Sequence, residues 1–133
     1  MEGFRVLVVD DELDFLETIV KRLQRRKVDV IGVESGKAAL ELLEQQQFDV
    51  VILDVRMPGM DGLDTLKEMK RKAPLMEVIM LTGHASVESG MQGMQLGAFD
   101  YVMKPASIND LLEKIKQAYE RKRLHEKKVR DVP

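Results

Sequence analysis

Short aliphatic runs alternate with longer segments of mixed polarity along the whole chain. Runs dense in Val, Ile and Leu, bounded by polar or turn residues, are typical of buried strands in a parallel sheet. Between these runs, apolar residues recur at the three- and four-residue spacing of an amphipathic helix. The pattern predicts strands over residues 4–9, 28–33, 48–53, 76–81 and 99–103, and helices with their apolar positions within 13–23, 38–43, 63–69, 87–96 and 108–119.

Five strand–helix units in succession predict an α/β protein, with one doubly wound, five-stranded parallel sheet and helices on both of its faces. Right-handed crossovers leave few topologies, and strand order 2-1-3-4-5 places the first and third strands side by side. The helix over 87–96 is diluted by Gly90 and Gly93. Since Gly costs about 1 kcal/mol relative to Ala in a helix, this helix is predicted to be weaker than the others.

Acidic residues stand where two of the aliphatic runs stop. Asp10 and Asp11 follow the first run, and Asp54 follows the third. In open parallel sheets the functional crevice lies outside the carboxyl ends of the strands, so these three side chains are expected to gather there. Crowded like charges repel, and the arrangement therefore makes most sense around a cation. Taken singly, each acid also fits a helix cap or a turn.

Composition narrows the class of protein. A chain of 133 residues suits one domain, and the absence of Cys excludes disulfides and thiolate metal sites. The net charge of -2 gives no overall attraction to nucleic acid or anionic lipid. No apolar stretch approaches the roughly 20 residues of a membrane span, and no signal-peptide pattern precedes the first strand. These features predict a cytoplasmic protein that does not enter a membrane.

Over about residues 4–118 the chain resembles the receiver domains of two-component response regulators. The resemblance rests on the acidic pair, on Leu-Asp-Val-Arg-Met-Pro-Gly-Met-Asp-Gly at 53–62, on Thr82 and on Tyr101-x-x-Lys104-Pro105. It implies a flavodoxin-like receiver fold with five helices over residues 1–119. After Tyr119 the apolar stripe fades, which predicts a C-terminal helix extension or linker over 120–133. Residues 81–88 and 96–101 further resemble receivers attached to enhancer-binding transcription activators, which implies control of transcription.

The resemblance also assigns the acidic site. It implies that Asp54 is the phosphoacceptor, which takes a phosphoryl group from a phosphohistidine on a sensor histidine kinase. The implied cofactor is Mg²⁺, bound directly by Asp11, Asp54 and the backbone carbonyl of Arg56, with Asp10 contributing largely through water. Lys104 is implied as the cationic partner of the phosphoryl group, aimed at the carboxylates by a cis bond to Pro105.

The same resemblance implies a switch. Thr82 would hydrogen-bond a phosphoryl oxygen, and Tyr101 would turn inward when Thr82 moves; each also fits an ordinary role at a strand. The output face would comprise the fourth helix, the fifth strand and the fifth helix. Met91 and Met94 are either core residues or an adaptable contact surface on that face. From position alone, we hypothesise that Arg56 and His84 set the lifetime of the phosphorylated state.

The expected partners are the kinase and an output domain or downstream protein, with a phosphorylation-dependent homodimer left open. The basic run Arg121–Arg130 is a solvated helix end, a linker helix or a dimer contact; it contains no DNA-binding motif, so direct nucleic-acid binding is not expected. With no output domain within 133 residues, the chain is expected to be a stand-alone receiver or part of a longer regulator.

Three other functions compete with a non-enzymatic phosphoacceptor. A haloacid-dehalogenase-type hydrolase would need Asp-x-Asp and a cap segment, whereas this chain has adjacent Asp10-Asp11 and no room for a cap. A flavodoxin-type flavin protein is disfavoured because an acidic mouth repels a phosphate and no phosphate-binding loop is present. A binding module that works without phosphorylation predicts the same fold with an inert Asp54, and it stays open.

Overall fold

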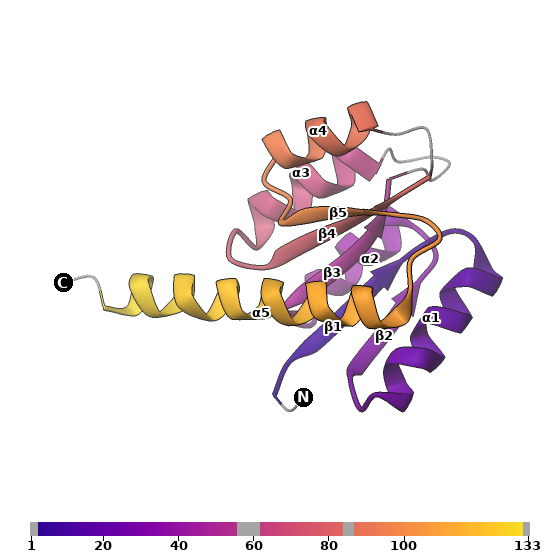
Figure 1. Ribbon diagram of the computed structural model, residues 1–133. Helices are drawn as coiled ribbons and strands as arrows, with labels where there is room; N and C mark the ends of the chain where they lie inside the picture. Colours follow the sequence, from indigo (N-terminus) through magenta and orange to yellow (C-terminus); the bar gives the residue numbers. More distant parts are fainter. Residues whose placement is uncertain (1–2, 56–61, 84–86, 132–133) are drawn as a thin grey trace.

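A computed structural model describes residues 3–55, 62–83 and 87–131 of the chain (Figure 1). In that part of the chain, strands and helices alternate from end to end, as the hydrophobic pattern predicts. The elements in chain order are β1 (Arg5–Val9), α1 (Leu13–Arg25), β2 (Asp29–Val33), α2 (Gly36–Leu43), β3 (Val50–Asp54), α3 (Gly62–Lys72), β4 (Glu77–Thr82), α4 (Val87–Gln95), β5 (Asp100–Met103) and α5 (Ile108–Arg130).

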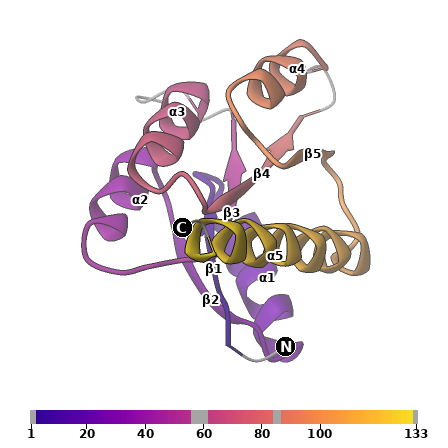
Figure 2. The ribbon, with the colours of Figure 1, turned by 90° about the vertical axis from the view of Figure 1, so that its left-hand side faces the viewer.

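The strands form one parallel sheet in the order β2-β1-β3-β4-β5, which confirms the predicted topology (Figure 2). β1 and β3 are neighbours, with Val9 paired to Leu53 in the register. The residues that follow these two positions, Asp10 and Asp54, therefore come side by side at the carboxyl edge of the sheet. All five residues of β3 are buried, because helices cover both faces of this central strand.

Two hydrophobic cores lie on opposite faces of the sheet. Alternate residues of one strand enter different cores, since successive side chains of a strand point to opposite faces: Val8 packs with α1 and α5, and Leu7 packs with α2 and α3. Figure 2 shows the same division, with α1 and α5 on one side of the sheet and α2, α3 and α4 on the other. The sheet therefore lies between two layers of helices.

Helix α5 is longer than its apolar stripe predicts. The stripe ends near Tyr119, yet α5 continues as one helix to Arg130 and projects past the sheet (Figure 1). Arg121 pairs with Glu77 at the start of β4, and Lys122 donates to Asp49 just before β3. The first residues of the expected extension over 120–133 therefore still contact the body of the domain.

Helix α4 presents its methionines to solvent. Met91 and Met94 are 60% and 41% exposed, and Met103 of the neighbouring β5 is 42% exposed. The interpretation of Met91 and Met94 as core residues is therefore wrong. Of the stretch 53–62 that carries the resemblance, residues 56–61 lie outside the described residues, and Gly62 is the first residue of α3.

Candidate functional site

Two buried carboxylates meet at the carboxyl edge of the sheet. Asp54 is the last residue of β3 and is 3% exposed, while Asp10 follows β1 and is fully buried. The backbone of Asp10 donates to the carbonyl of Val33 (3.1 Å), which extends the β1–β2 pairing by one residue. The Asp10 carboxylate accepts from the backbone N–H of Glu12 (2.9 Å) and so helps to start α1. Asp10 is therefore both a turn residue before α1 and a member of the carboxylate site.

Lys104 brings a positive charge to this site. Its Nζ lies 2.8 Å from Asp10 Oδ2, 3.4 Å from Glu12 Oε1 and 3.6 Å from Asp54 Oδ2. The backbone N–H of Lys104 donates to the carbonyl of Thr82 (2.8 Å), and the bond to Pro105 is cis, as the resemblance implies. Burial lowers the pKa of Lys104, but the hydrogen bond to Asp10 and the surrounding carboxylates outweigh it and raise that pKa above its ordinary value.

Three carboxylates at this edge are arranged closely enough to share a cation. One oxygen each from Asp10, Glu12 and Asp54 lies within 4.8 Å of the others. Carboxylate oxygens are the ligands that Mg²⁺ takes in proteins, usually few of them together with several waters. The residues present therefore fit the cofactor that the resemblance implies.

Glu12 is a member of this group that the sequence interpretation missed. It is the N-cap residue of α1, but its side chain makes no capping hydrogen bond and instead turns toward Lys104. The signal available in the sequence is the run of three acids, Asp10-Asp11-Glu12. Asp11, which the resemblance implies as a direct ligand, is exposed and does not belong to the group of three oxygens.

Thr82 and Tyr101 lie on the two strands beyond Asp54. Thr82 is the last residue of β4 and is buried, and the register aligns it with Met103 of β5. Tyr101 is half-buried, and its ring lies against α4 at Gly90, where an added Cβ would come within 3.1 Å of the ring. Gly90 thus makes room for the ring between α4 and β5.

Two predicted site residues lie outside the described residues. These are Arg56, including its backbone carbonyl, and His84. The structure therefore gives no position for the proposed tuning side chains or for the third direct metal ligand.

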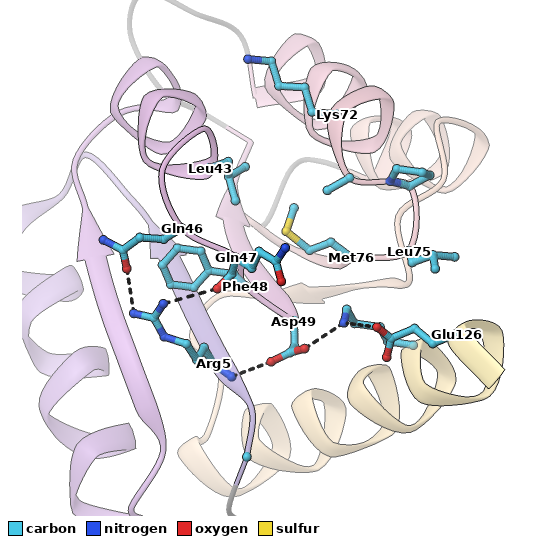
Figure 3. Close-up of a pocket in the computed structure, with 14 residues that line it drawn as sticks. Arg5, Leu43, Gln46, Gln47, Phe48, Asp49, Lys72, Leu75, Met76 and Glu126 are labelled. Carbon is cyan, nitrogen blue, oxygen red and sulfur yellow. Dashed lines mark hydrogen bonds and ion pairs between the residues drawn. The ribbon is translucent and has the colours of Figure 1, made fainter. Parts of the chain in front are cut away.

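A groove of about 570 Å³ lies at the opposite, amino-terminal edge of the sheet (Figure 3). Several polar side chains that line the groove hydrogen-bond to one another. The Arg5 guanidinium donates to Gln46 (2.9 Å), the Asp49 carboxylate accepts from the Arg5 backbone (2.8 Å) and from Lys122, and Lys122 also donates to Glu126. No residue of the carboxylate site lines this groove, so we assign its polar contacts to the anchoring of α5 and β3.

A five-stranded doubly wound sheet with clustered carboxylates and a lysine at its carboxyl edge is the architecture of a receiver domain. The sequence matches the family model described as the response regulator receiver domain over residues 6–116. The chain belongs to this family, and it is a receiver domain related to transcriptional regulators of two-component systems.

Two curated relatives are bacterial regulators of transcription. The chain is 37% identical over 117 residues to the transcriptional regulatory protein ZraR of Escherichia coli (strain K12), which covers 88% of this chain and 26% of that protein. It is 35% identical over 113 residues to the DNA-binding transcriptional regulator NtrC of the same organism, which covers 85% of this chain and 24% of that protein. The chain thus spans about a quarter of the length of these relatives.

A solved structure agrees with the fold. The crystal structure of a response regulator receiver domain protein from Clostridium thermocellum superimposes with a TM-score of 0.87 at 36% identity, covering 92% of this chain and 98% of that one.

Among the described residues, no helix combines the length and apolar character needed to cross a bilayer.

Proposed function

We propose that this domain is a Mg²⁺-dependent phosphoacceptor, which takes a phosphoryl group from a sensor histidine kinase onto Asp54. The observation that carries the proposal is the placement of Asp54 at the end of β3, with the Lys104 ammonium 3.6 Å from its carboxylate. A carboxylate serves as a nucleophile in this kind of chemistry, and an adjacent cation stabilises the charge on the transferred group.

The transfer exchanges one bond to phosphorus for another. An Asp54 carboxylate oxygen attacks the phosphorus, a P–O bond forms, and the P–N bond to the kinase histidine breaks. The leaving imidazole nitrogen keeps the bonding electron pair, and the product on Asp54 is a mixed carboxylic–phosphoric anhydride. Phosphoryl transfer depends mostly on positioning and on charge stabilisation, and Lys104 supplies part of both.

The carboxylate cluster serves the cofactor. Asp54 together with Asp10 and Glu12 would hold Mg²⁺, and the resemblance adds Asp11 and the Arg56 carbonyl to this set. The bound ion supplies charge neutralisation for the phosphoryl oxygens. Lys104 lies beside the same carboxylates and so stays within reach of a group placed on Asp54.

The proposed signal travels through β4, β5 and α4. A modification at Asp54 changes a distant surface only if two conformations pre-exist and the phosphoryl group favours one of them. We assign Thr82 as the contact to the phosphoryl oxygens and Tyr101 as the side chain that follows it. The Tyr101 ring already contacts α4 at Gly90. A movement of the Tyr101 ring would therefore displace α4, the helix that presents the exposed Met91 and Met94.

The output of this switch is proposed from the relatives. ZraR and NtrC are named as transcriptional regulators, and the chain corresponds to about a quarter of each. We infer that the α4–β5–α5 face contacts an output domain or a downstream protein that controls transcription, or a second copy of the domain after phosphorylation. The receiver itself acts as a signalling domain, and its chemistry is confined to its own phosphorylation and dephosphorylation.

Arg56 and His84 are proposed to tune the lifetime of the phosphorylated state. Each lies two residues beyond a proposed site residue, Asp54 or Thr82. The test is the rate of phosphoryl loss from Arg56→Asn and His84→Ala after removal of the phosphoryl donor. Unchanged rates in both variants would reject this assignment.

The proposal is tested by the intact mass of the protein after incubation with acetyl phosphate, with and without Mg²⁺. Wild type should gain one phosphoryl group only with Mg²⁺, and Asp54→Ala should gain none. Asp14→Ala is the matched control, since Asp14 is an exposed carboxylate in the first turn of α1 and should leave the modification intact. If neither acetyl phosphate nor a cognate kinase modifies wild type, the domain is a binding module that works without phosphorylation.

A further inference from the structure

The ammonium group of Lys104 also contacts an aromatic ring. Its Nζ lies 4.3 Å from the centroid of the Phe15 ring, within the roughly 6 Å over which a cation is attracted to the face of an aromatic ring. Phe15 is half-buried on the first turn of α1 and packs against the core between α1 and α5. The ring is therefore partly enclosed between α1 and the core.

The N-terminal end of α1 supplies two neighbours of Lys104. Glu12 is the N-cap residue of α1, and Phe15 lies in its first turn. The Glu12 carboxylate and the Phe15 ring accordingly both reach the ammonium, at 3.4 Å and 4.3 Å. Only 17% of the Lys104 side chain remains exposed, although lysine has a flexible four-carbon stem that usually extends into water.

Phosphoryl transfer changes the carboxylates that contact Lys104, but it does not change the Phe15 ring. Asp54 loses its free carboxylate when it is phosphorylated, and Asp10 and Glu12 belong to the oxygen cluster that fits a cation. Each carboxylate thus changes its charge or its partner during the cycle. The electrostatic character of the Phe15 ring stays the same before and after transfer, because no proton, metal or phosphoryl group binds to it.

We propose that Phe15 is a positioning residue for phosphoryl transfer, whose ring face holds the Lys104 ammonium beside Asp54 throughout the cycle. The inference rests on the proposed function of Asp54. A leucine at this position would fill much of the same volume but would offer no negative face to a cation. Lys104 would then turn toward solvent for part of the time. During that time its ammonium would not stabilise the charge on the transferred phosphoryl group.

The test compares Phe15→Leu with Phe15→Tyr, which keeps the ring face, in the wild-type and Lys104→Met backgrounds. The measured quantity is the rate constant of phosphoryl uptake from acetyl phosphate at saturating Mg²⁺. Phe15→Leu should slow uptake by about three- to tenfold, the range expected for a partly desolvated cation–π contact, while Phe15→Tyr stays within about twofold of wild type. In the Lys104→Met background, Phe15→Leu should change nothing further, because its effect passes through the lysine.

A second readout needs no phosphorylation. The ring current of Phe15 should shift the Lys104 side-chain protons upfield in the NMR spectrum of wild type and Phe15→Tyr, but not of Phe15→Leu. Uptake by Phe15→Leu at the wild-type rate would overturn the proposal. An equal slowing by Phe15→Leu in the Lys104→Met background would also overturn it, since that result indicates a packing role. If wild type takes up no phosphoryl group while the upfield shift is present, the proposed function fails and the ring contact stands.

Discussion

Replacing Arg121 with methionine should destabilise the protein by about 2 kcal/mol, because it removes the main partner of a buried carboxylate. Glu77 is the first residue of β4, and its side chain is 2% exposed. The Arg121 guanidinium donates to both of its carboxylate oxygens and also stacks on the ring of Phe99, 4.7 Å from its centroid. The pair fixes the point at which α5 leaves the domain.

The magnitude follows from what remains after the substitution. Removing one partner of a buried ion pair typically costs about 3–5 kcal/mol, because the other charge is left uncompensated. Here Lys70 stays 3.6 Å from Glu77, and the Arg121 side chain is 40% exposed, so water and a second cation reduce the loss. A loss of about 2 kcal/mol corresponds to a fall in Tm of roughly 5–10 °C for a domain of this size.

The assay is urea unfolding followed by circular dichroism, with the free energy of unfolding compared at constant m-value. The Glu77→Gln/Arg121→Met double variant should recover about 1 kcal/mol relative to the sum of the single variants, since the stranded charge is then gone. Arg123→Met is the matched control, because Arg123 is 61% exposed on the same helix and should change stability by less than about 0.5 kcal/mol. A wild-type free energy of unfolding for Arg121→Met, or strict additivity in the double variant, would show that Arg121 does not compensate the buried Glu77 charge.

Three further perturbations have defined outcomes. Saturating Mg²⁺ at about 100 times its Kd should raise the free energy of unfolding by about 2.7 kcal/mol in wild type and much less in Asp54→Asn, measured by urea unfolding; equal gains would contradict a site at Asp54. Gly62→Ala should cost about 1–3 kcal/mol in the same assay, because the added Cβ would overlap the Val55 backbone; wild-type stability would contradict this packing. Burial lowers the pKa of Lys122, but its hydrogen bonds, above all to Asp49, outweigh burial and raise that pKa overall. The stabilisation that Lys122 contributes is therefore complete below the unfolded pKa of about 10.4, and it is lost as pH rises through the higher folded pKa. The stability difference between wild type and Lys122→Gln should therefore narrow above about pH 10.4, and a constant difference up to pH 12 would count against it.

The sequence predicts the sheet and the meeting of Asp10 with Asp54 because both depend on local patterns. Aliphatic runs identify strands, and the rule that parallel strands end at one edge then places the residues that follow them. The contacts of Glu12 and Phe15 with Lys104 are different. They depend on how the first turn of α1 is oriented toward the end of β5, about 90 residues away along the chain, and no periodicity reports that orientation.

The full length of α5 also escapes the hydrophobic pattern. Beyond Tyr119 the helix is held by ion pairs, in which Arg121 and Lys122 reach back to Glu77 and Asp49. A basic run after an apolar stripe gives no sign of such partners, because the acids are more than 40 residues earlier in the chain. The hydrophobic pattern therefore does not predict these long-range ion pairs, whereas the contact of Lys104 with the carboxylates follows from the family resemblance.

Phosphorylation of Asp54 is tested most directly by identifying the residue that carries the phosphoryl group. The Mg²⁺- and acetyl phosphate-treated protein is reduced with borohydride, which converts an aspartyl phosphate to homoserine, and is then digested with trypsin. Asp49 and Asp54 fall in one tryptic peptide, residues 38–56, so fragmentation of this peptide contains its own control. We expect homoserine at position 54 and unchanged aspartate at position 49. Homoserine at another position, with Asp54 intact, would contradict it.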